Sequence, residues 1–160
     1  MPPRGGVRGE PPGVDERPGM PHVARTSAET FAGLVRQVRC EHRVRVRRWR
    51  REMTGCAWQV THAGGWAVRW IEAPVPRTPL SLAIFLHEVG HHAIGFDRYR
   101  RRCEEEYHAW AWALTRMRAA GVEPDGPTLR RFELSMRYAV GKAVRRGIKS
   151  VPAGLERFAA

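Results

Sequence analysis

The chain has 160 residues, a formal net charge of +12 and a hydrophobic content of 42%, with six Trp. This length suits one domain around one core, and the composition excludes a wholly disordered chain. The most apolar stretch, LSLAIFLHEVG, is interrupted by Ser, His and Glu, so we expect no membrane span.

The net charge comes almost entirely from arginine, because Lys142 and Lys149 are the only lysines. A basic balance of this size favours polyanionic partners, nucleic acid among them. No aromatic-interleaved recognition motif accompanies the charge, and a solvated basic surface accounts for it as well. A solvated basic surface is therefore the preferred interpretation of the charge, and nucleic-acid binding is the alternative.

The N-terminal region differs in composition from the rest of the chain. Residues 1–24 hold six of the twelve prolines and many glycines and arginines, which disfavours helix and strand alike. We expect a disordered tail over residues 1–24, one domain over 25–150 and a C-terminal tail over 151–160. No apolar segment follows the first arginines, and Cys40, Cys56 and Cys103 form no CxxC pair. A cytoplasmic protein with reduced thiols is the expectation.

The predicted domain begins with a helix and a small sheet. Thr26 followed by Glu29 is a capping-box pattern, and apolar residues recur at helical spacing from Phe31 to Val38. The runs HRVRVRRWR and CAWQVTHAGGWAVRWIEAP then favour strands, with a turn at Gly64-Gly65. This pattern predicts a short antiparallel sheet with a hairpin.

Three helices are predicted after the sheet, which makes the fold class α+β. The first covers about residues 80–94 and ends at Gly95. The second lies in CEEEYHAWAWALTRMRAAG, and the third is amphipathic and ends near Gly147. The apolar side of the third consists of Leu129, Phe132, Met136, Val140 and Ala143.

The first of these three helices contains HEVGHH, residues 87–92. Residues four apart on a helix lie about 40° apart around the axis, so the imidazoles of His87 and His91 can reach one ion. Two imidazoles and a carboxylate suit Zn²⁺, and a fourth position left to water makes such a site catalytic. Glu88 is the predicted general base, which would take a proton from that water and pass it to a leaving amine. The predicted reaction is hydrolysis of a peptide bond.

The surroundings of the motif favour a metal site over a set of core histidines. The neighbouring positions 82, 84–86 and 89 are apolar, so the helix is apolar almost all round. Burying unpaired histidines and a carboxylate there would be costly unless they were hydrogen-bonded or bound to metal. His92 points elsewhere, and we expect it to pack or face solvent rather than bind the ion.

A third protein ligand has to come from another segment, and the following helix offers three adjacent glutamates. Relative to the large apolar residues of that helix, Glu106 lies about 70° from the centre of the stripe, Glu104 about 90° and Glu105 nearly opposite. Glu106 is therefore the first choice, Glu104 is the reserve, and Glu105 is expected to face water near the helix N-terminus. His108 lies further from the core face and ranks below them.

Asp97 is a further candidate for the third ligand. In metzincin-like enzymes this ligand follows the second histidine by six residues, which is the position of Asp97. Those enzymes have glycine at the third place, where this chain has Ile94, and Gly95 comes one residue later. Asp97 therefore ranks below Glu106.

With HEVGHH and the later EYHAWAWA, the chain resembles the ImmA/IrrE family of small zinc-dependent metallopeptidases. In that family an HExxH helix precedes a helix with the pattern E-x-x-A-x-x-aromatic-A, whose first Glu binds zinc. The corresponding residues here are Glu106, Ala109, Trp112 and Ala113. The resemblance covers about residues 26–120. It implies a gluzincin-like site in a compact zincin-like domain, with a short antiparallel sheet packed against helices and HExxH on a central helix.

The resemblance also implies a protein substrate, with a transcriptional repressor as the first candidate. SprT-like proteases, which act on proteins at DNA, are similar as well and would suit the basic charge, although their third ligand is usually histidine. Two non-enzymatic functions also fit the sequence, namely a zinc-binding module without catalysis and a nucleic-acid-binding module.

Two further features of the sequence bear on how a substrate would be held. The strand over residues 65–72 could pair with an extended substrate along an open edge. Tyr99, Tyr107 and Tyr138 are candidate oxyanion stabilisers, and the sequence does not rank them.

Overall fold

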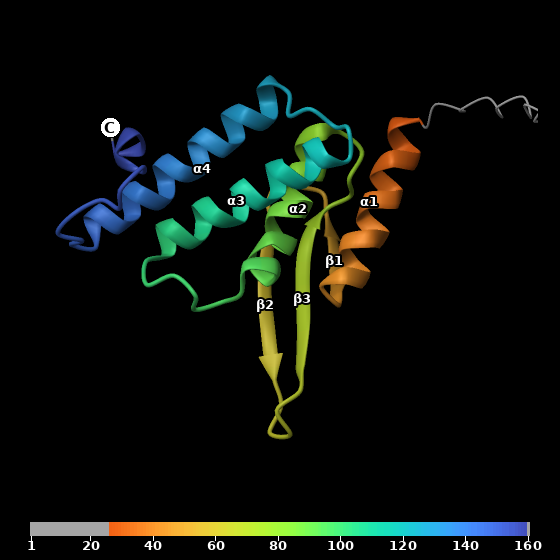
Figure 1. Cartoon of the computed structure of the whole chain (residues 1–160), viewed down its shortest axis with the longest axis horizontal. Coiled ribbons are helices and arrows are strands. Elements are labelled where there is room, and N and C mark those ends of the chain that lie inside the picture. The colour runs from red at the N-terminus through yellow and green to blue at the C-terminus, as the bar shows by residue number, and fades with distance from the viewer. Residues whose placement is uncertain (1–25, 160) are drawn as a thin grey trace, which may run out of the picture.

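The computed structural model describes residues 26–159, and the predicted disordered tail over residues 1–24 lies outside them. The described chain forms four helices, a three-stranded sheet and a short 3₁₀ helix, so the predicted α+β class is confirmed (Figure 1). In chain order these are α1 (Ser27–Glu41), β1 (Val44–Arg50), β2 (Cys56–Thr61), β3 (Ala67–Pro74), α2 (Pro79–Ile94), α3 (Arg102–Ala119), α4 (Gly126–Arg145) and η1 (Glu156–Phe158). Among the described helices, none has the length and apolar character needed to cross a bilayer.

Local sequence sets the ends of the helices. The predicted capping box of α1 is present, with Thr26 and Glu29 exchanging side-chain and backbone hydrogen bonds. A second capping box, between Thr78 and Ser81, opens α2, where a proline at the first position costs no hydrogen bond. Gly95 ends α2 with φ at +86°, in the left-handed region that glycine adopts without strain.

The sheet is mixed rather than antiparallel. Its strand order is β1-β3-β2, in which β3 pairs with β2 in the predicted antiparallel hairpin and with β1 in parallel. The alternation of Val and Arg in β1 indicates which residues share a face, but it carries no information on strand direction. Burial is the better guide to position, because β3 has three buried residues, β1 has one and β2 has none.

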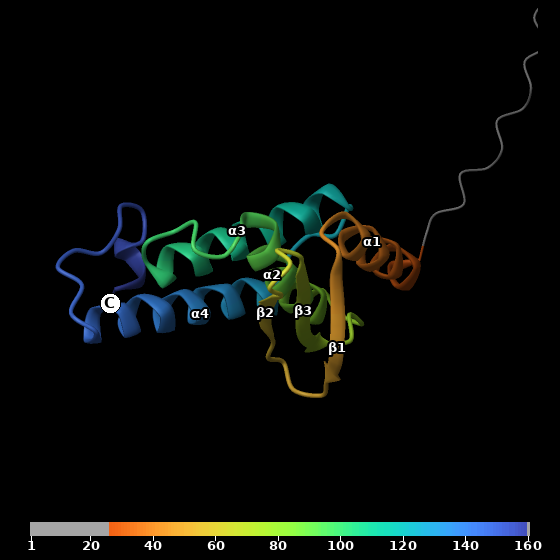
Figure 2. The same cartoon turned by 90° about the horizontal axis from the view of Figure 1, so that it is seen from below.

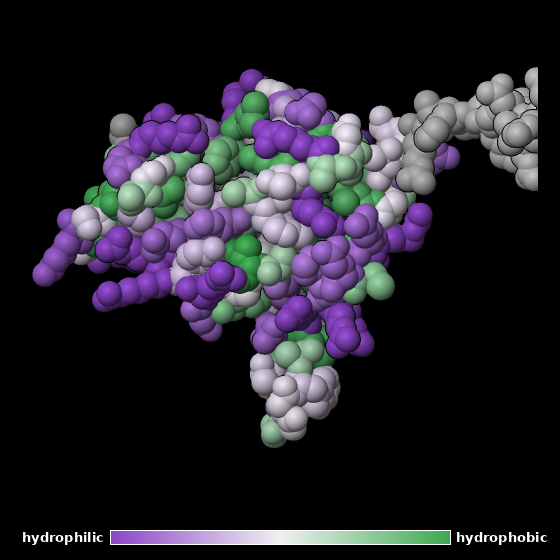
Figure 3. Space-filling view, viewed as in Figure 1, coloured by the Kyte–Doolittle hydropathy of each residue, from purple (hydrophilic) through white to green (hydrophobic). Residues whose placement is uncertain are grey.

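The prediction of an open edge at residues 65–72 was therefore wrong. These residues belong to β3 and the turn before it, and β3 is hydrogen-bonded on both sides. Within the described part of the chain, β1 and β2 are the edge strands, and β2 is the edge strand of the hairpin. The hairpin projects from the body of the molecule as an arm (Figures 1 and 3).

The helix α2 lies at the centre of the molecule, between the sheet and α3. It packs against β3 on one side and α3 on the other, while α1 covers β1. The approach of α2 to α3 is close, because a Cβ built at Gly90 would lie 2.7 Å from the carbonyl oxygen of Ala109. The helices α3 and α4 run antiparallel beside each other, so the start of α3 lies next to the end of α4 (Figure 2).

Two expectations about the C-terminal part need correction. Residues 151–160 were predicted to be a C-terminal tail, but the described part, up to Ala159, packs on the domain. Leu155 and Phe158 are buried in the core cluster, and η1 packs on α4. On α4, Met136 and Val140 are buried as predicted, but Leu129 is 45% exposed. Leu129 lies in the first turn of α4, at the edge of the core.

Candidate metal centre

The predicted HExxH helix places four polar side chains in the core. His87, Glu88, His91 and His92 all lie on α2, and each is 7% exposed or less. Such groups are costly to bury unless each one finds a partner. The partners come from α3 for His87 and His91, and from β3 for His92.

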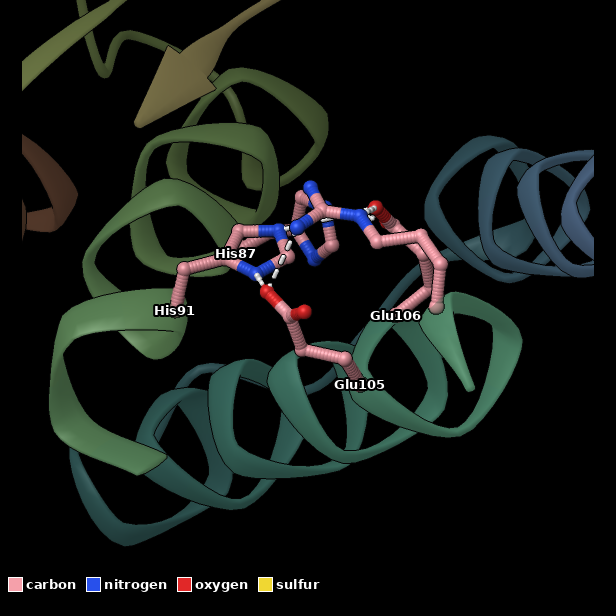
Figure 4. Close-up of polar contacts among 5 residues, drawn as sticks. His87, His91, Glu105 and Glu106 are labelled. Atoms are coloured by element: carbon pink, nitrogen blue, oxygen red, sulfur yellow. Dashed lines mark hydrogen bonds and ion pairs between the residues drawn. The ribbon is translucent and has the colours of Figure 1, made fainter. Parts of the chain in front are cut away.

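Three of the predicted metal-binding residues meet at one point. The Nε2 atom of His87 lies 3.2 Å from Oε2 of Glu106, and Nε2 of His91 lies 3.8 Å from Oε1 of the same carboxylate. Figure 4 shows the two histidines reaching from α2 toward the glutamates of α3. One ligand atom from each of the three residues lies within 4.8 Å of the other two, so the group could hold a metal ion.

The distances within this group can be compared with those between the donor atoms of a bound metal ion. Zinc bonds to His and Glu are about 2.0–2.2 Å long, so two donors on one tetrahedral ion lie about 3.3 Å apart. The distance of 3.2 Å between Nε2 of His87 and Oε2 of Glu106 is close to this value, and the distance of 3.8 Å between Nε2 of His91 and Oε1 of Glu106 is longer. Three protein donors leave a tetrahedral ion one open position, which is the arrangement of catalytic rather than structural sites.

Glu105 is buried and does not face water as predicted from the sequence. It is 6% exposed, and its Oε1 atom lies 2.9 Å from Nδ1 of His91. A carboxylate can only accept a hydrogen bond, so Nδ1 of His91 carries the proton and Nε2 is left free to bind a metal. The contact therefore selects the tautomer that the proposed ligand role requires.

Arg102 links the two glutamates of α3. Its Nη1 atom lies 2.6 Å from Oε1 of Glu105, and its Nε atom lies 2.9 Å from Oε1 of Glu106. Burial alone would raise the pKa of both carboxyls, but for Glu105 the His91 hydrogen bond and the Arg102 charge outweigh it and lower the pKa. For Glu106 the contacts with His87, His91 and Arg102 lower the pKa to about 2. Both side chains are therefore carboxylates at neutral pH.

Glu88 lies apart from the ion-pair network, beside the start of β2. A Cβ built at Gly55 would lie 2.5 Å from Cγ and Oε1 of Glu88, so the carboxyl occupies the space that the missing side chain leaves. Burial raises the pKa of Glu88 to about 7, with the charge of His91 opposing the rise and that of Glu106 adding to it. Glu88 also lines the cleft that contains His87, His91 and Glu106.

The structure separates Glu106 from the other candidates for third ligand. Within the described residues, the potential metal-binding group contains neither Glu104 nor Asp97. Asp97 is exposed in the turn after α2, with φ at +64°, and the ring of His108 stacks on that of Tyr99 at 4.2 Å. His92 packs as expected, and its Nε2 atom lies 3.0 Å from the carbonyl oxygen of Trp70. Burial lowers the pKa of His92 to about 4, so the ring is neutral.

A cleft of about 630 Å³ opens over the three converging side chains. This volume is in the range of small-ligand and peptide sites, about 300–1,000 Å³. One wall is formed by residues 54–57 at the start of β2 and another by one face of α4. Of the three candidate oxyanion stabilisers, Tyr138 lines the cleft, whereas Tyr99 and Tyr107 do not.

Sequence analysis missed Glu105, Gly55 and the contribution of α4 to this site. The position of Glu105 could have been found from Ala109 and Ala113, four and eight residues later, because small residues at helical spacing mark a face where two helices approach closely. The prediction for α3 used only its large apolar residues, and the buried face that it gave was rotated away from Glu105. No local signal indicates that Gly55 lies against Glu88, because the contact joins a loop to a helix about 33 residues later.

Comparisons with family models, curated proteins and solved structures found no match to this chain. The resemblance to ImmA/IrrE metallopeptidases therefore rests on the motif residues alone.

Proposed function

We propose that the protein is a zinc-dependent metalloendopeptidase in which His87, His91 and Glu106 hold the ion and Glu88 is the general base. The convergence of two imidazoles and one carboxylate in a cleft, with Glu88 lining the same cleft, carries the proposal. Zinc held there would polarise a substrate carbonyl and make a coordinated water more acidic. The remaining roles belong to the side chains of the chain itself.

Glu88 is the group placed to move the proton. Its carboxyl lines the cleft without belonging to the metal-binding group, and Gly55 leaves the space that the side chain occupies. A general base must lie within hydrogen-bond reach of the proton that it takes, and then return the proton to the leaving amine. Tyr138, on the α4 wall, is the remaining candidate for stabilising the oxyanion.

The edge of β2 supports a peptide as the substrate. Cys56 and Ala57 of β2 line the cleft, and within residues 26–159 β2 is paired only with β3. An extended peptide could pair with this free edge and pass over the converging side chains. The ImmA/IrrE resemblance extends the proposal to one specific cytoplasmic protein, with a transcriptional repressor as the first candidate.

Hydrolysis by wild type and Glu88→Gln, each loaded with one equivalent of zinc, tests the proposal. A library of peptides with mixed sequences is incubated with each protein, and the products are identified by mass spectrometry. We expect cleavage by wild type only, with equal zinc content in both proteins. No cleavage by zinc-loaded wild type, or equal cleavage by both, would contradict the proposal.

A further inference from the structure

We propose that the cleft selects acidic peptide segments, through the cations that line it around the converging side chains. The inference rests on the proposed function, because it names the class of substrate for the same site. It depends on where the positive charge lies, which the net charge of +12 alone does not indicate.

The cleft is lined by more cations than its own carboxylates can pair. Glu88 and Glu106 are the two acidic residues among its lining residues, and Arg102 already contacts Glu106. Five further cations line the cleft, and within the described residues none of them lies within 4.0 Å of a carboxylate: Arg100, Arg101, Arg131, Lys142 and Arg146.

The unpaired cations are arranged by the secondary structure. Arg131 and Lys142 lie on one face of α4, with Ser135 and Tyr138 between them at helical spacing, and Arg146 follows as the C-cap residue of this helix. Arg100 and Arg101 precede α3, whose start lies beside the end of α4 (Figures 1 and 2). Hydrophilic side chains extend from this end of the molecule (Figure 3). A substrate in the cleft would thus meet a concentration of positive charge where the start of α3 lies beside the end of α4.

A peptide fits this arrangement better than nucleic acid does. The cations line a cleft of about 630 Å³, whereas duplex DNA needs a broad and open basic surface. Cys56 and Ala57 of the edge strand β2 also line the cleft, and a strand edge can form a β-ladder with a peptide but not with a sugar-phosphate chain. Acidic side chains flanking the scissile bond would complete the ion pairs that the cleft lacks.

Binding can be measured separately from cleavage with the full-length Glu88→Gln variant loaded with zinc. Three fluorescein-labelled peptides share one uncharged central sequence and differ in their flanks, which carry Glu, Ser or Lys. We expect fluorescence anisotropy to give at least about tenfold tighter binding of the Glu peptide than of the Ser peptide, with the difference shrinking as salt rises. Equal binding of the Glu and Ser peptides would overturn the inference.

Charge reversal distinguishes the cleft from the overall charge of the protein. In the Glu88→Gln background, the double variant Lys142→Glu, Arg146→Glu should lose the preference for the Glu peptide. The matched control is Arg145→Glu, Lys149→Glu, which changes the charge equally at two exposed residues outside the cleft and should keep the preference. Circular dichroism checks that both variants fold. Equal loss in both variants would assign the effect to net charge and overturn the inference.

Two further measurements complete the test. A competition experiment distinguishes a peptide site from a nucleic-acid site, and a cleavage experiment distinguishes binding from cleavage. Single-stranded and duplex oligonucleotides with the same number of negative charges should compete more weakly than the Glu peptide, and stronger competition would make the cleft a nucleic-acid site. Wild type is then tested for cleavage of the same peptides. A binding preference without any cleavage would overturn the proposed peptidase and leave the acidic preference standing. Cleavage without an acidic preference would overturn only the proposed preference for acidic peptides.

Discussion

Glu105 accepts a hydrogen bond from the ring of His91, with Oε1 of the carboxylate 2.9 Å from Nδ1 of the imidazole. This contact turns Nε2 of His91 toward Glu106 and fixes the tautomer that can bind a metal. The helix α3 thus contributes twice to the site. It supplies the proposed ligand Glu106 and also the carboxylate of Glu105, which orients the proposed ligand His91. Arg102 then ties the two glutamates of α3 together.

Removing the orienting carboxylate should weaken metal binding without removing a ligand. We expect Glu105→Ala to lower the zinc affinity about 10- to 100-fold, as is typical when the partner of a ligating histidine is lost. Competition with a chromogenic chelator measures the affinity. Glu104→Ala is the matched control, since Glu104 is adjacent in sequence and outside the metal-binding group. Equal affinities in the two variants would mean that Glu105 does not orient the site.

Gly55 should matter through the space that it leaves for Glu88. In Gly55→Ala the new methyl group would meet Cγ and Oε1 of Glu88 at 2.5 Å, and a flexible side chain can move away. We expect a folded protein that binds zinc as wild type does but loses most of the proposed peptidase activity. Gly33→Ala is the control, because nothing lies within 4 Å of a Cβ at Gly33. Full activity in Gly55→Ala would show that the position of Glu88 is not critical.

Gly90 should matter for stability instead. A Cβ there would lie 2.7 Å from the carbonyl oxygen of Ala109, and this contact is with backbone that cannot rotate away. We expect Gly90→Ala to reduce the free energy of unfolding by about 1–3 kcal/mol, as overpacking usually does. Urea denaturation measures the change. A Gly90→Ala protein as stable as wild type would mean that α2 and α3 can separate at little cost.

The stability of α4 should depend on acid pH through Asp125. Its carboxylate accepts hydrogen bonds from the backbone N–H and the hydroxyl of Thr128, which lower its pKa below the ordinary value. The stabilisation is therefore complete above the pKa of Asp in the unfolded chain and is lost as the pH falls through the lower pKa of the folded state. Asp125→Ala should cost about 1 kcal/mol at neutral pH.

Asp125→Asn provides the control for this pH dependence. Asparagine also caps helices but does not titrate, so it should retain most of the stability at neutral pH and lose the acid-dependent part. Denaturation curves at several pH values between neutral and strongly acidic conditions compare the three proteins. The same acid dependence in Asp125→Asn as in wild type would assign it to other carboxylates.

The helices and the histidine pair could be predicted because their signals are local. The capping box at Thr26 and the four-residue spacing of His87 and His91 each depend on neighbouring residues in one element. The parallel pairing of β1 with β3 could not be predicted, since strand direction depends on contacts about 25 residues apart. The burial of Glu105 was missed because its partner lies on another helix. Glu106 lies beside both histidines, and its direction from α3 could be estimated from the helical repeat, whereas its role as a metal ligand stays a prediction.

Zinc content after dialysis is the most direct test of the central claim, and it compares wild type, Glu106→Ala and Glu104→Ala. Circular dichroism of each zinc-free protein establishes that the variants are folded before zinc is added. We expect one zinc per chain in wild type and Glu104→Ala, and a large loss of zinc in Glu106→Ala, because Glu106 meets both histidines and Glu104 lies outside the metal-binding group. Full retention of zinc by Glu106→Ala, or no zinc in wild type, would contradict the account.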